Sequence, residues 1–351
     1  MKRYLFYISQ NYSFAILRPI QKILIARGDK VCWFFEGDAV NDGYLSYEEE
    51  KLDTVEQIID YNPNAVLVPA QSMPSFLPGL KVSVNHGFDI GKKDRKGNND
   101  HFKLRGCFDL FCTQGPDTSL PFKSLQKKYK FFNVIETGWS AIDPLFNTPL
   151  TQHGNDKPVI LYCSTFSKRL TSTRALLPMI KKLSHTGKWD WLIQFHPKMD
   201  NEIICSYQAL QGDYLTYVET DDIIPLLLQA DVMVCDTSSV MPMFSLLNKP
   251  VVSYNNVAPG PQLLDINDPE KLELTINYAL TKPQNLMSEI RKYNNHIHPY
   301  RDGKSSQRVI DAIDEVLQGK HPVKNRQFAI HIRNIFKNLK YRKRLNFWKL
   351  K

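Results

Sequence analysis

The chain has 351 residues, 42% of them hydrophobic and 23% charged, which is the composition of a water-soluble globular protein long enough for two domains. No apolar run approaches the ~20 residues that a membrane-spanning helix needs, so the sequence argues against such helices. Six cysteines without a C-x-x-C pair favour buried, reduced thiols in a cytosolic protein over a disulfide framework or a structural zinc site.

The formal net charge of +9 is a property of the C-terminal end of the chain. Residues 321–351 hold ten Lys and Arg and no Asp or Glu, so +9 less 10 leaves the first 320 residues with a net charge of −1. The body of the protein therefore has no overall excess of positive charge with which to hold nucleic acid.

The first part of the chain alternates strands with an amphipathic helix. The pattern predicts a strand over 2–9, a helix over 14–28 that ends at Gly28, and a second strand over 30–37. Short apolar runs follow at 65–70, 81–86, 107–113 and 134–138. Strands that are apolar throughout, alternating with helices, predict a parallel sheet covered on both faces.

A second series of the same kind begins after residue 157. Its strand-like runs and helices fall at 158–164, 173–186, 189–197, 221–229, 232–236, 239–248 and 250–254. The stretch between the two series is polar and contains Pro and Gly, which is typical of a linker. We therefore predict two facing Rossmann-like domains, with boundaries at 1–147 for the first, 148–157 for the linker, 158–320 for the second and 321–351 for a basic tail.

Polar motifs stand directly after several of these strands. In doubly wound sheets, ligands bind beyond the carboxyl ends of the strands. The motifs at these ends are His86-Gly87, Thr165 with Lys168 and Arg169, His196-Pro197, and Asp236-Thr237-Ser238-Ser239. Their position predicts that they line a ligand-binding site.

The last of these motifs has two interpretations. Small hydroxyl side chains before a predicted helix could let a phosphate approach the unpaired N–H groups of its first turn. Asp236 could accept hydrogen bonds from the following amides or from a ribose hydroxyl. The alternative is a plain helix cap, since Asp, Thr and Ser are all good capping residues. The chain has no G-x-x-x-x-G-K-[ST] loop, which excludes a P-loop.

Two of the nine histidines, His86 and His196, stand at strand ends beside a Gly or a Pro. Gly87 would let the backbone come close to a ligand. We expect the other seven histidines to be surface or loop residues: His101, His153, His185, His296, His298, His321 and His331.

The order of these motifs resembles the CDP-glycerol glycerophosphotransferase family, the teichoic-acid primases and polymerases. That family has an HG motif in its first domain, then a Y-A-P-T-x-R strand end, an HP motif and a D-x-S-S-x motif followed by a K-P strand. The corresponding residues here are His86-Gly87, Tyr162-Cys163-Ser164-Thr165, His196-Pro197, and Asp236-Thr237-Ser238-Ser239 with Lys249-Pro250. Residues 300–306 resemble the family's closing D-G-x-[AS]-[ST] segment, so the resemblance covers about residues 80–316.

The chain departs from the family pattern at three places. Phe88 follows the HG motif where the family commonly has Thr, and Ser164 replaces the Pro before Thr165. Residues 138–143 stand in place of the family's G-x-P-R-x-D segment. These changes fall mostly on the side expected to hold the acceptor, and so they bear on the acceptor and the transferred group more than on the nucleotide.

The resemblance implies a GT-B fold and transfer of a polyol phosphate, with glycerol phosphate first among the candidates. The donor would be CDP-activated, the acceptor a hydroxyl of a cell-surface glycan or lipid-linked molecule, and CMP the leaving group. His86 would be the base, and His196 would bind the pyrophosphate and stabilise the leaving CMP. The phosphates would be held by Thr165, Arg169, Thr237, Ser238 and Ser239. Asp236 would fix the ribose or the loop.

We expect neither an essential metal nor a separate cofactor, because no paired carboxylates stand at a strand end. The basic tail, residues 321–351, mixes Lys and Arg with apolar residues at spacings of three and four, which is typical of an amphipathic helix on an anionic membrane surface. This predicts a cytoplasmic protein, peripheral on the inner face of the cell membrane. The alternative is a solvated tail, or one that binds RNA without specificity.

Two other functions fit the same sequence. One is a GT-B glycosyltransferase that uses a nucleotide sugar, with His86 still the base. The other is a non-catalytic protein that binds a nucleotide or a nucleic acid. Donor turnover would separate the first from the phosphotransferase, and nucleotide binding without turnover would favour the second.

Overall fold

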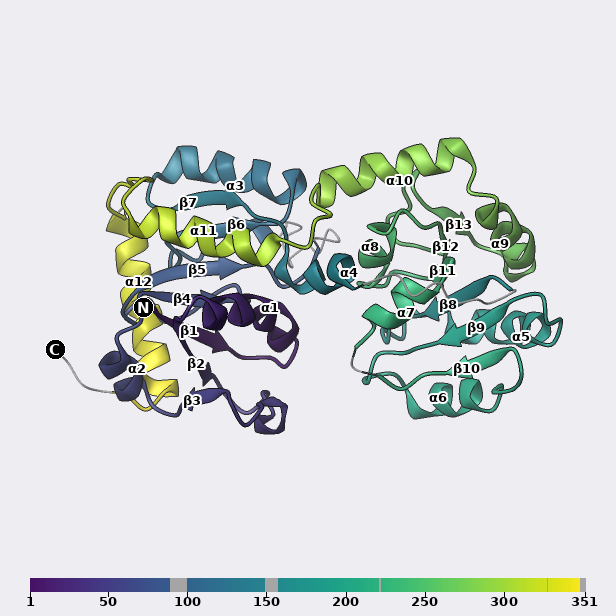
Figure 1. Cartoon of the computed structure of the whole chain (residues 1–351), viewed down its shortest axis with the longest axis horizontal. Coiled ribbons are helices and arrows are strands. Elements are labelled where there is room, and N and C mark those ends of the chain that lie inside the picture. The colour runs from purple at the N-terminus through teal and green to yellow at the C-terminus, as the bar shows by residue number, and fades with distance from the viewer. Residues whose placement is uncertain (89–99, 149–156, 221, 327, 348–351) are drawn as a thin grey trace. The chain divides into compact units, whose positions relative to one another are not determined.

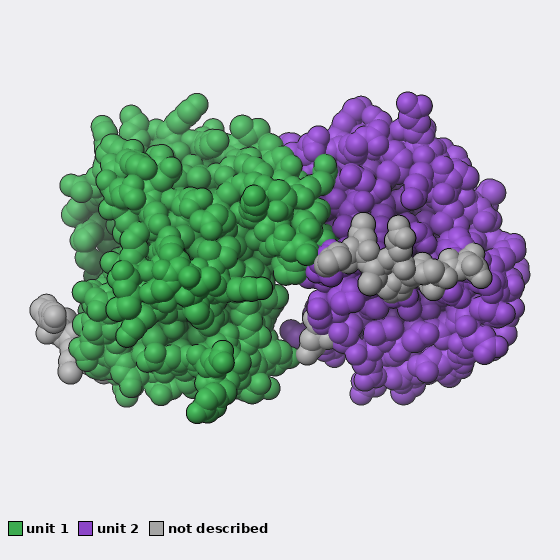
Figure 2. Space-filling view, in the orientation of Figure 1, with its two compact units in different colours: residues 1–147, 297–351 green, residues 148–296 purple. Residues whose placement is uncertain are grey.

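The computed structural model describes residues 1–88, 100–148, 157–220, 222–326 and 328–347. The chain divides into two compact units, each built on one parallel β-sheet (Figures 1 and 2). The first unit comprises residues 1–147 and 297–351, and the second comprises residues 148–296. The two parallel α/β sheets confirm the predicted fold class.

The sheet of the first unit has seven parallel strands in the order β3-β2-β1-β4-β5-β6-β7. The strands are β1 (Arg3–Ile8), β2 (Lys30–Phe35), β3 (Glu50–Leu52), β4 (Ala65–Val68), β5 (Leu80–Val84), β6 (Leu110–Thr113) and β7 (Asn133–Glu136). The helices are α1 (Ser13–Ala26), α2 (Val55–Tyr61), α3 (Pro116–Tyr129), α4 (Asp143–Asn147), α11 (Ser305–Leu317) and α12 (Phe328–Arg344). Strand order reverses between β1 and β4, as in doubly wound folds.

Alternate residues of a strand point to opposite faces of the sheet. In β1, residues that point to either face are buried, so both faces of this sheet are covered. Leu5 and Tyr7 of β1 belong to a core cluster with side chains of α2, α3 and α12. On the other face, Phe6 packs edge-on against Trp33, and Trp33 contacts Phe14 of α1. Helix α11 lies beside α1 on this second face.

The sheet of the second unit has six parallel strands in the order β10-β9-β8-β11-β12-β13. The strands are β8 (Val159–Cys163), β9 (Asp190–Ile193), β10 (Leu215–Tyr217), β11 (Val232–Cys235), β12 (Val251–Tyr254) and β13 (Leu264–Ile266). The helices are α5 (Thr173–Ser184), α6 (Asn201–Gln208), α7 (Ile224–Gln229), α8 (Met241–Ser245), α9 (Leu272–Leu280) and α10 (Gln284–Ile297). Strand order reverses here between β8 and β11.

The predicted extension of the second domain to residue 320 is wrong. The second unit ends at His296, and the chain then returns to the first unit, where α11 packs on β5 and β6. Most of the predicted linker, residues 149–156, lies outside the described residues. Periodicity could find α11 as a helix, but the sheet on which it packs is set by contacts distant in sequence.

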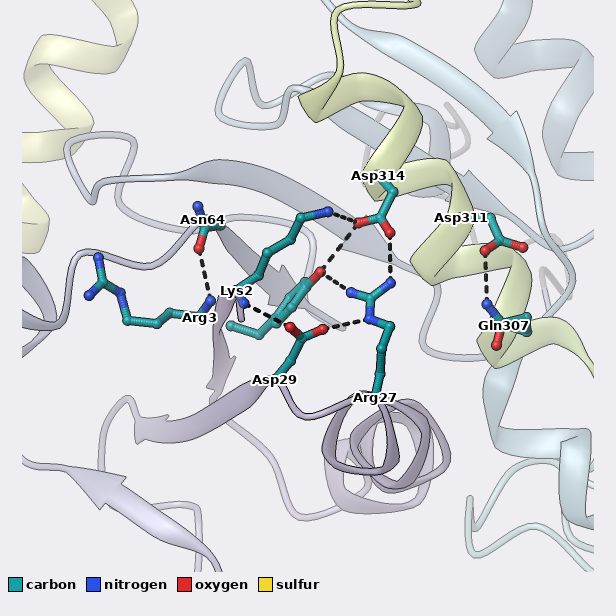
Figure 3. A network of polar contacts seen from close by, with 9 residues as sticks. Lys2, Arg3, Arg27, Asp29, Asn64, Gln307, Asp311 and Asp314 are labelled. Atoms are coloured by element: carbon teal, nitrogen blue, oxygen red, sulfur yellow. Dashed lines mark hydrogen bonds and ion pairs between the residues drawn. The ribbon is translucent and has the colours of Figure 1, made fainter.

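A network of charged groups joins α11 to the start of the chain (Figure 3). Asp314 of α11 accepts from Lys2 Nζ at 2.5 Å and from Arg27 Nη1 at 2.6 Å. Arg27 also donates to Asp29 at 2.6 Å and to the Tyr4 hydroxyl at 2.7 Å. All five residues belong to the first unit, so the network fixes α11 to that unit.

The sequence predicted that residues 321–351 form a tail separate from the domains. For the described part of this segment, residues 321–326 and 328–347, the prediction is wrong. Helix α12 packs on the first unit, where Ile330 and, just beyond the helix, Phe347 enter the core cluster. The Tyr341 hydroxyl lies 3.0 Å from that of Ser72, and Arg344 forms an ion pair with Glu36 at the end of β2. Helix α12 is amphipathic, as predicted, and one of its faces packs on the first unit.

The six cysteines are free thiols, and five of them are buried, as expected from their apolar surroundings. Among the described residues, no helix is long and apolar enough to cross a membrane.

Candidate active site

The polar motifs of the second unit follow three adjacent strands. Thr165 comes after β8, His196 after β9 and Asp236 after β11. The reversal of strand order between β8 and β11 separates the loops that follow these two strands, which is where doubly wound sheets bind ligands. The sequence motifs therefore meet at the expected edge of the sheet.

Asp236 is fully buried and organises the loop that follows β8. Its Oδ1 accepts from the Thr165 backbone N–H at 2.9 Å, and its Oδ2 accepts from the N–H and hydroxyl of Ser172, each at 2.9 Å. The Ser164 hydroxyl also donates to Oδ2. Burial raises the pKa of Asp236, and these hydrogen bonds oppose that rise.

This geometry corrects part of the prediction for Asp236. Its partners are the amides of Thr165 and Ser172 and not those that follow it in sequence. Both carboxylate oxygens are engaged with the loop, so of the two predicted roles the structure favours fixing the loop over binding a ribose. The residue acts by shaping the backbone around Thr165.

The hydroxyl side chains after Asp236 follow the carboxyl end of β11. Ser238 is buried, and its Oγ accepts from the Val240 N–H at 3.4 Å, whereas Ser239 is exposed. The Thr237 hydroxyl accepts from the Val257 N–H at 3.1 Å. Helix α8 begins only at Met241 and has five residues, so it is shorter than the helix predicted over 239–248. A dipole from so short a helix is small, and phosphate binding here would depend on the hydroxyls and loop amides.

His196 is an exposed side chain whose ring lies against that of Phe166, with ring centroids 4.7 Å apart and the planes tilted by 36°. Its Nδ1 accepts from the Lys198 N–H at 3.0 Å, so in the neutral ring the proton is on Nε2. Partial desolvation and the positive charge of Lys198 lower the pKa of His196. A neutral His196 thus presents an Nε2–H donor to a ligand.

Two further residues of this unit have different surroundings. Arg169 is exposed in the loop between β8 and α5. Lys249, of the K-P motif, donates its ammonium group to the carbonyls of Leu227, Leu228 and Ala230 at the end of α7. Burial lowers the pKa of Lys249 to about 8. The Lys249 side chain therefore caps the C-terminal end of α7, and this contact explains its position without a ligand.

In the first unit, His86 follows β5 and lines a pocket at the carboxyl edge of the sheet. Phe108, Phe111 and Phe122 form an apolar part of the lining, and Lys103 and Arg105 contribute positive charge. The His101 ring lies 6.0 Å from that of His86 and also lines the pocket. His101 is therefore part of this site, although the sequence analysis placed it among the surface or loop residues.

Gly87 adopts a φ of +152°, which side-chain-bearing residues rarely adopt. No described atom lies within 4 Å of the position a Cβ would take. The glycine therefore serves the backbone turn after His86, and none of the described residues fills the space beside it.

A chain of hydrogen bonds supports the loop that carries His86. The indole N–H of Trp139 donates to the Asn85 carbonyl at 2.8 Å, and the Asn85 amide donates to the Gln114 side chain at 3.2 Å. The Trp139 backbone N–H donates to His298 Nε2 at 2.9 Å. Phe88, the residue that departs from the family pattern, packs edge-on against Trp139 at 5.2 Å.

His298 lies in the loop between α10 and α11, as expected, but it is 1% exposed and so is not a surface residue. Its Nδ1 lies 2.7 Å from the Tyr300 carbonyl, to which it donates, and its Nε2 accepts from Trp139. Burial lowers the pKa of His298 to about 4, so the ring is neutral near pH 7. The one feature of the sequence that points to a role for His298 is its position just before the closing segment, residues 300–306.

That closing segment pairs with residues 138–143 within the first unit. The Asp143 carboxylate accepts from the N–H groups of Ser305 and Ser306 at 2.8 and 2.7 Å, at the start of α11. Gly138 has a φ of +82°, and a Cβ there would lie 2.5 Å from Ser305 Oγ and 2.8 Å from His298 Nε2. The segment thus supports the loop that carries His86, although the sequence placed it in the second domain.

Within the described residues, no group of three or more His, Cys, Asp or Glu side chains is arranged to hold a metal ion. That the reaction needs no essential metal stays a prediction. The roles given to the site residues also stay predictions.

Comparisons with known proteins agree with the motifs. Residues 123–256 match the family CDP-Glycerol:Poly(glycerophosphate) glycerophosphotransferase. A curated relative, the teichoic acid glycerol-phosphate primase of Bacillus subtilis (strain 168), is 28% identical over 180 residues, which is 46% of this chain and 44% of the relative. The match thus spans less than half the length of that relative. The resemblance to the family is confirmed.

Solved structures show the same fold at low sequence identity. A structure of the wall teichoic acid polymerase TagF has a TM-score of 0.64 and 16% identity, over 91% of this chain and 89% of that one. A putative UDP-N-acetylglucosamine 2-epimerase from Listeria monocytogenes has a TM-score of 0.65 and 13% identity, over 90% and 97% of the two chains. These neighbours have the GT-B fold, and at such low sequence identity the similarity establishes the fold alone.

Proposed function

We propose, on the premise of its match to the CDP-glycerol glycerophosphotransferase family, that this chain transfers a polyol phosphate from a CDP-activated donor to an acceptor hydroxyl and releases CMP. Glycerol phosphate is the first candidate for the transferred group, and a cell-surface glycan or lipid-linked molecule is the acceptor. The observation that carries the proposal is that the family match, residues 123–256, contains every nucleotide-side residue named above, from Thr165 to Ser239.

In this reaction His86 takes the proton of the acceptor hydroxyl as its oxygen attacks the β-phosphorus of the donor. The bond from that phosphorus to the CMP oxygen breaks, and CMP leaves with the electron pair. An imidazole with an ordinary pKa of ~6.5 suits this proton transfer near neutral pH. The support from Trp139 and Asn85 would hold His86 in position.

On the donor side, the His196 Nε2–H would donate to the pyrophosphate and offset the charge that develops on the leaving CMP. Thr165, whose backbone is fixed by Asp236, would face the same phosphates together with Arg169 and the hydroxyls of residues 237–239. The exposed position of Arg169 allows it to approach a bound donor from solvent.

The test is donor turnover by the purified chain. CDP-glycerol, CDP-ribitol and a panel of nucleotide sugars would be incubated with a membrane extract as acceptor, and nucleotide release would be followed. We expect CMP from a CDP-polyol, and a fall of about 100-fold or more in the His86→Ala variant, the size of a lost general base. The exposed His185, at the end of α5, offers the matched control His185→Ala, which should retain wild-type turnover.

Other outcomes would contradict the proposal in different ways. Release of UDP or GDP from a nucleotide sugar would assign the chain to the glycosyltransferases of the same fold. Nucleotide binding without turnover of any donor would favour a non-catalytic role.

We also propose that α12 holds the protein on an anionic membrane surface on the cytoplasmic side. Five apolar residues of this helix are exposed, by 37 to 77%: Phe328, Ile332, Ile335, Phe336 and Leu339. Their spacings of four, three, one and three place them on one face, opposite the buried Ile330, Asn334 and Tyr341. The basic residues Lys340 and Lys343 accompany this face, which fits anionic lipid headgroups.

A further inference from the structure

The pocket beside His86 has a positively charged wall that the reaction described above does not use. Lys103 and Arg105 line it together with His86 and His101, and none of its described lining residues is acidic. Arg105 donates to the side chain of Gln71, also in the lining, at 2.5 Å. Such a lining would favour an anion over a neutral ligand.

Helix α12 binds the segment that carries this wall through three consecutive carbonyl groups. Arg333 donates to the Leu104 carbonyl at 3.2 Å, Lys337 to that of Arg105 at 3.1 Å, and Asn334 to that of Gly106 at 2.7 Å. These three helix residues lie on the face opposite the exposed apolar residues or at its border.

Close packing at Gly106 shows that the contact is specific. Gly106 has a φ of +81°, and a Cβ there would lie 2.7 Å from Ile330 Cγ2 and 3.0 Å from Arg333 Nη2. Asn334 is 6% exposed, so its hydrogen bond to the Gly106 carbonyl is shielded from water. The helix thus fixes the backbone on both sides of Arg105.

We propose that Lys103 and Arg105 form an anion-binding site for a phosphate ester of the acceptor, and that α12 is the positioning element that holds this site beside His86. The ligand class is a phosphate mono- or diester that carries a hydroxyl within reach of His86. One helix then presents its outer face to the membrane and holds the acceptor site with its inner face. The acceptor assignment rests on the proposed function, whereas the anion site can be tested without turnover.

The experiment measures binding of glycerophosphoglycerol, a phosphodiester of two glycerols, to the full chain by calorimetry in the absence of donor. We expect the wild-type protein to bind it in preference to neutral glycerol. Arg105→Gln and Lys103→Gln should each weaken binding about tenfold, as expected for loss of a charge-assisted hydrogen bond. Lys22→Gln removes a charge from the exposed side of α1 and should bind as the wild type does.

A second set of variants tests the positioning role of α12 with the wall charges intact. Lys337→Met and Asn334→Ala should weaken binding several-fold, whereas Lys337→Arg, which keeps a donor for the Arg105 carbonyl, should retain it. Thermal unfolding of each variant separates lost binding from lost folding. Lys103 is exposed, so Lys103→Gln keeps the test valid if an α12 variant fails to fold.

Three results would overturn the proposal. The first is equal binding of glycerol and glycerophosphoglycerol, and the second is wild-type affinity in both wall variants. The third is displacement of glycerophosphoglycerol by CDP-glycerol in direct competition, which would show that the wall holds a phosphate of the donor. Binding without any CMP release would leave this site standing and contradict the proposed function alone.

Discussion

At the scale of single residues, Asp236 is the group on which the loop after β8 depends. Its two oxygens accept hydrogen bonds from four donors of the loop after β8. In Asp236→Asn, an amide N–H₂ would face a backbone N–H that needs an acceptor, which leaves a buried donor unsatisfied. We expect the free energy of unfolding to fall by about 2 kcal/mol, measured by urea denaturation.

Ser239→Ala is the contrasting variant, because Ser239 is exposed and is proposed to contact phosphate. It should leave stability unchanged while weakening CDP-glycerol binding. Unchanged stability in Asp236→Asn would contradict the loop-fixing role.

His298 makes a prediction about pH. Its pKa is about 4 in the folded chain against 6.5 for an ordinary histidine, because burial disfavours the charged ring. Between these pH values the unfolded chain binds more protons than the folded chain, so stability falls as the pH is lowered from 6.5 to about 4. The gap corresponds to about 3 kcal/mol at most.

Urea unfolding of wild type and His298→Gln at several pH values measures this effect. The variant should be less stable at pH 7, because the contacts of the buried ring are lost, but its stability should vary less over this window. The same slope in both proteins would rule out His298 as the source.

The strand-end residues could be predicted from the sequence, and the residues that support them could not. His86, His196 and Asp236 each follow an apolar strand, which is a local signal. His298 lies next to Trp139 only because the chain returns from the second unit to the first, and no local pattern encodes that return. The partners of Asp236 come from the loop before α5, 64 to 72 residues earlier in the chain, and no local pattern encodes that pairing either.

At the scale of elements, the two helices after residue 297 have the largest difference between expectation and structure. Their periodicity indicates helices, but the partner of each apolar face depends on packing. Polar anchors such as the Asp314 carboxylate and the Asn334 amide decide that partner, and single-sequence periodicity does not reveal them.

Asp314→Ala tests the anchor of α11 shown in Figure 3. It removes the acceptor shared by Lys2 and Arg27, which are partly exposed, so we expect a loss of about 1 kcal/mol in the free energy of unfolding. Asp311→Ala on the same helix, where the carboxylate contacts only Gln307 in Figure 3, is the matched control and should change stability little. Equal effects of the two variants would mean that the network contributes nothing specific.

At the scale of the whole molecule, the exposed apolar face of α12 predicts binding to membranes. Phe336→Ser with Leu339→Ser should reduce co-sedimentation with vesicles that contain anionic lipid by about tenfold or more, because both side chains would enter the interface. Binding of the wild type should weaken with added salt, since the basic residues contribute through screened charge. Leu274→Ser, at a 73% exposed position of the second unit, is the control.

Vesicle binding that is unchanged in the double variant, or equally reduced in the control, would contradict a membrane role for this face. Binding to neutral vesicles alone would leave the basic residues without the role given to them.

The central claim is that the chain moves a polyol phosphate from a CDP-activated donor to an acceptor. The most direct measurement uses CDP-glycerol labelled in the glycerol, with a membrane extract as acceptor, and counts CMP released and label transferred. The account predicts equal amounts of both in the wild type and a fall of about 100-fold or more in both in His86→Ala. Release of CMP without label in the acceptor, or turnover unchanged by the His86 substitution, would contradict it.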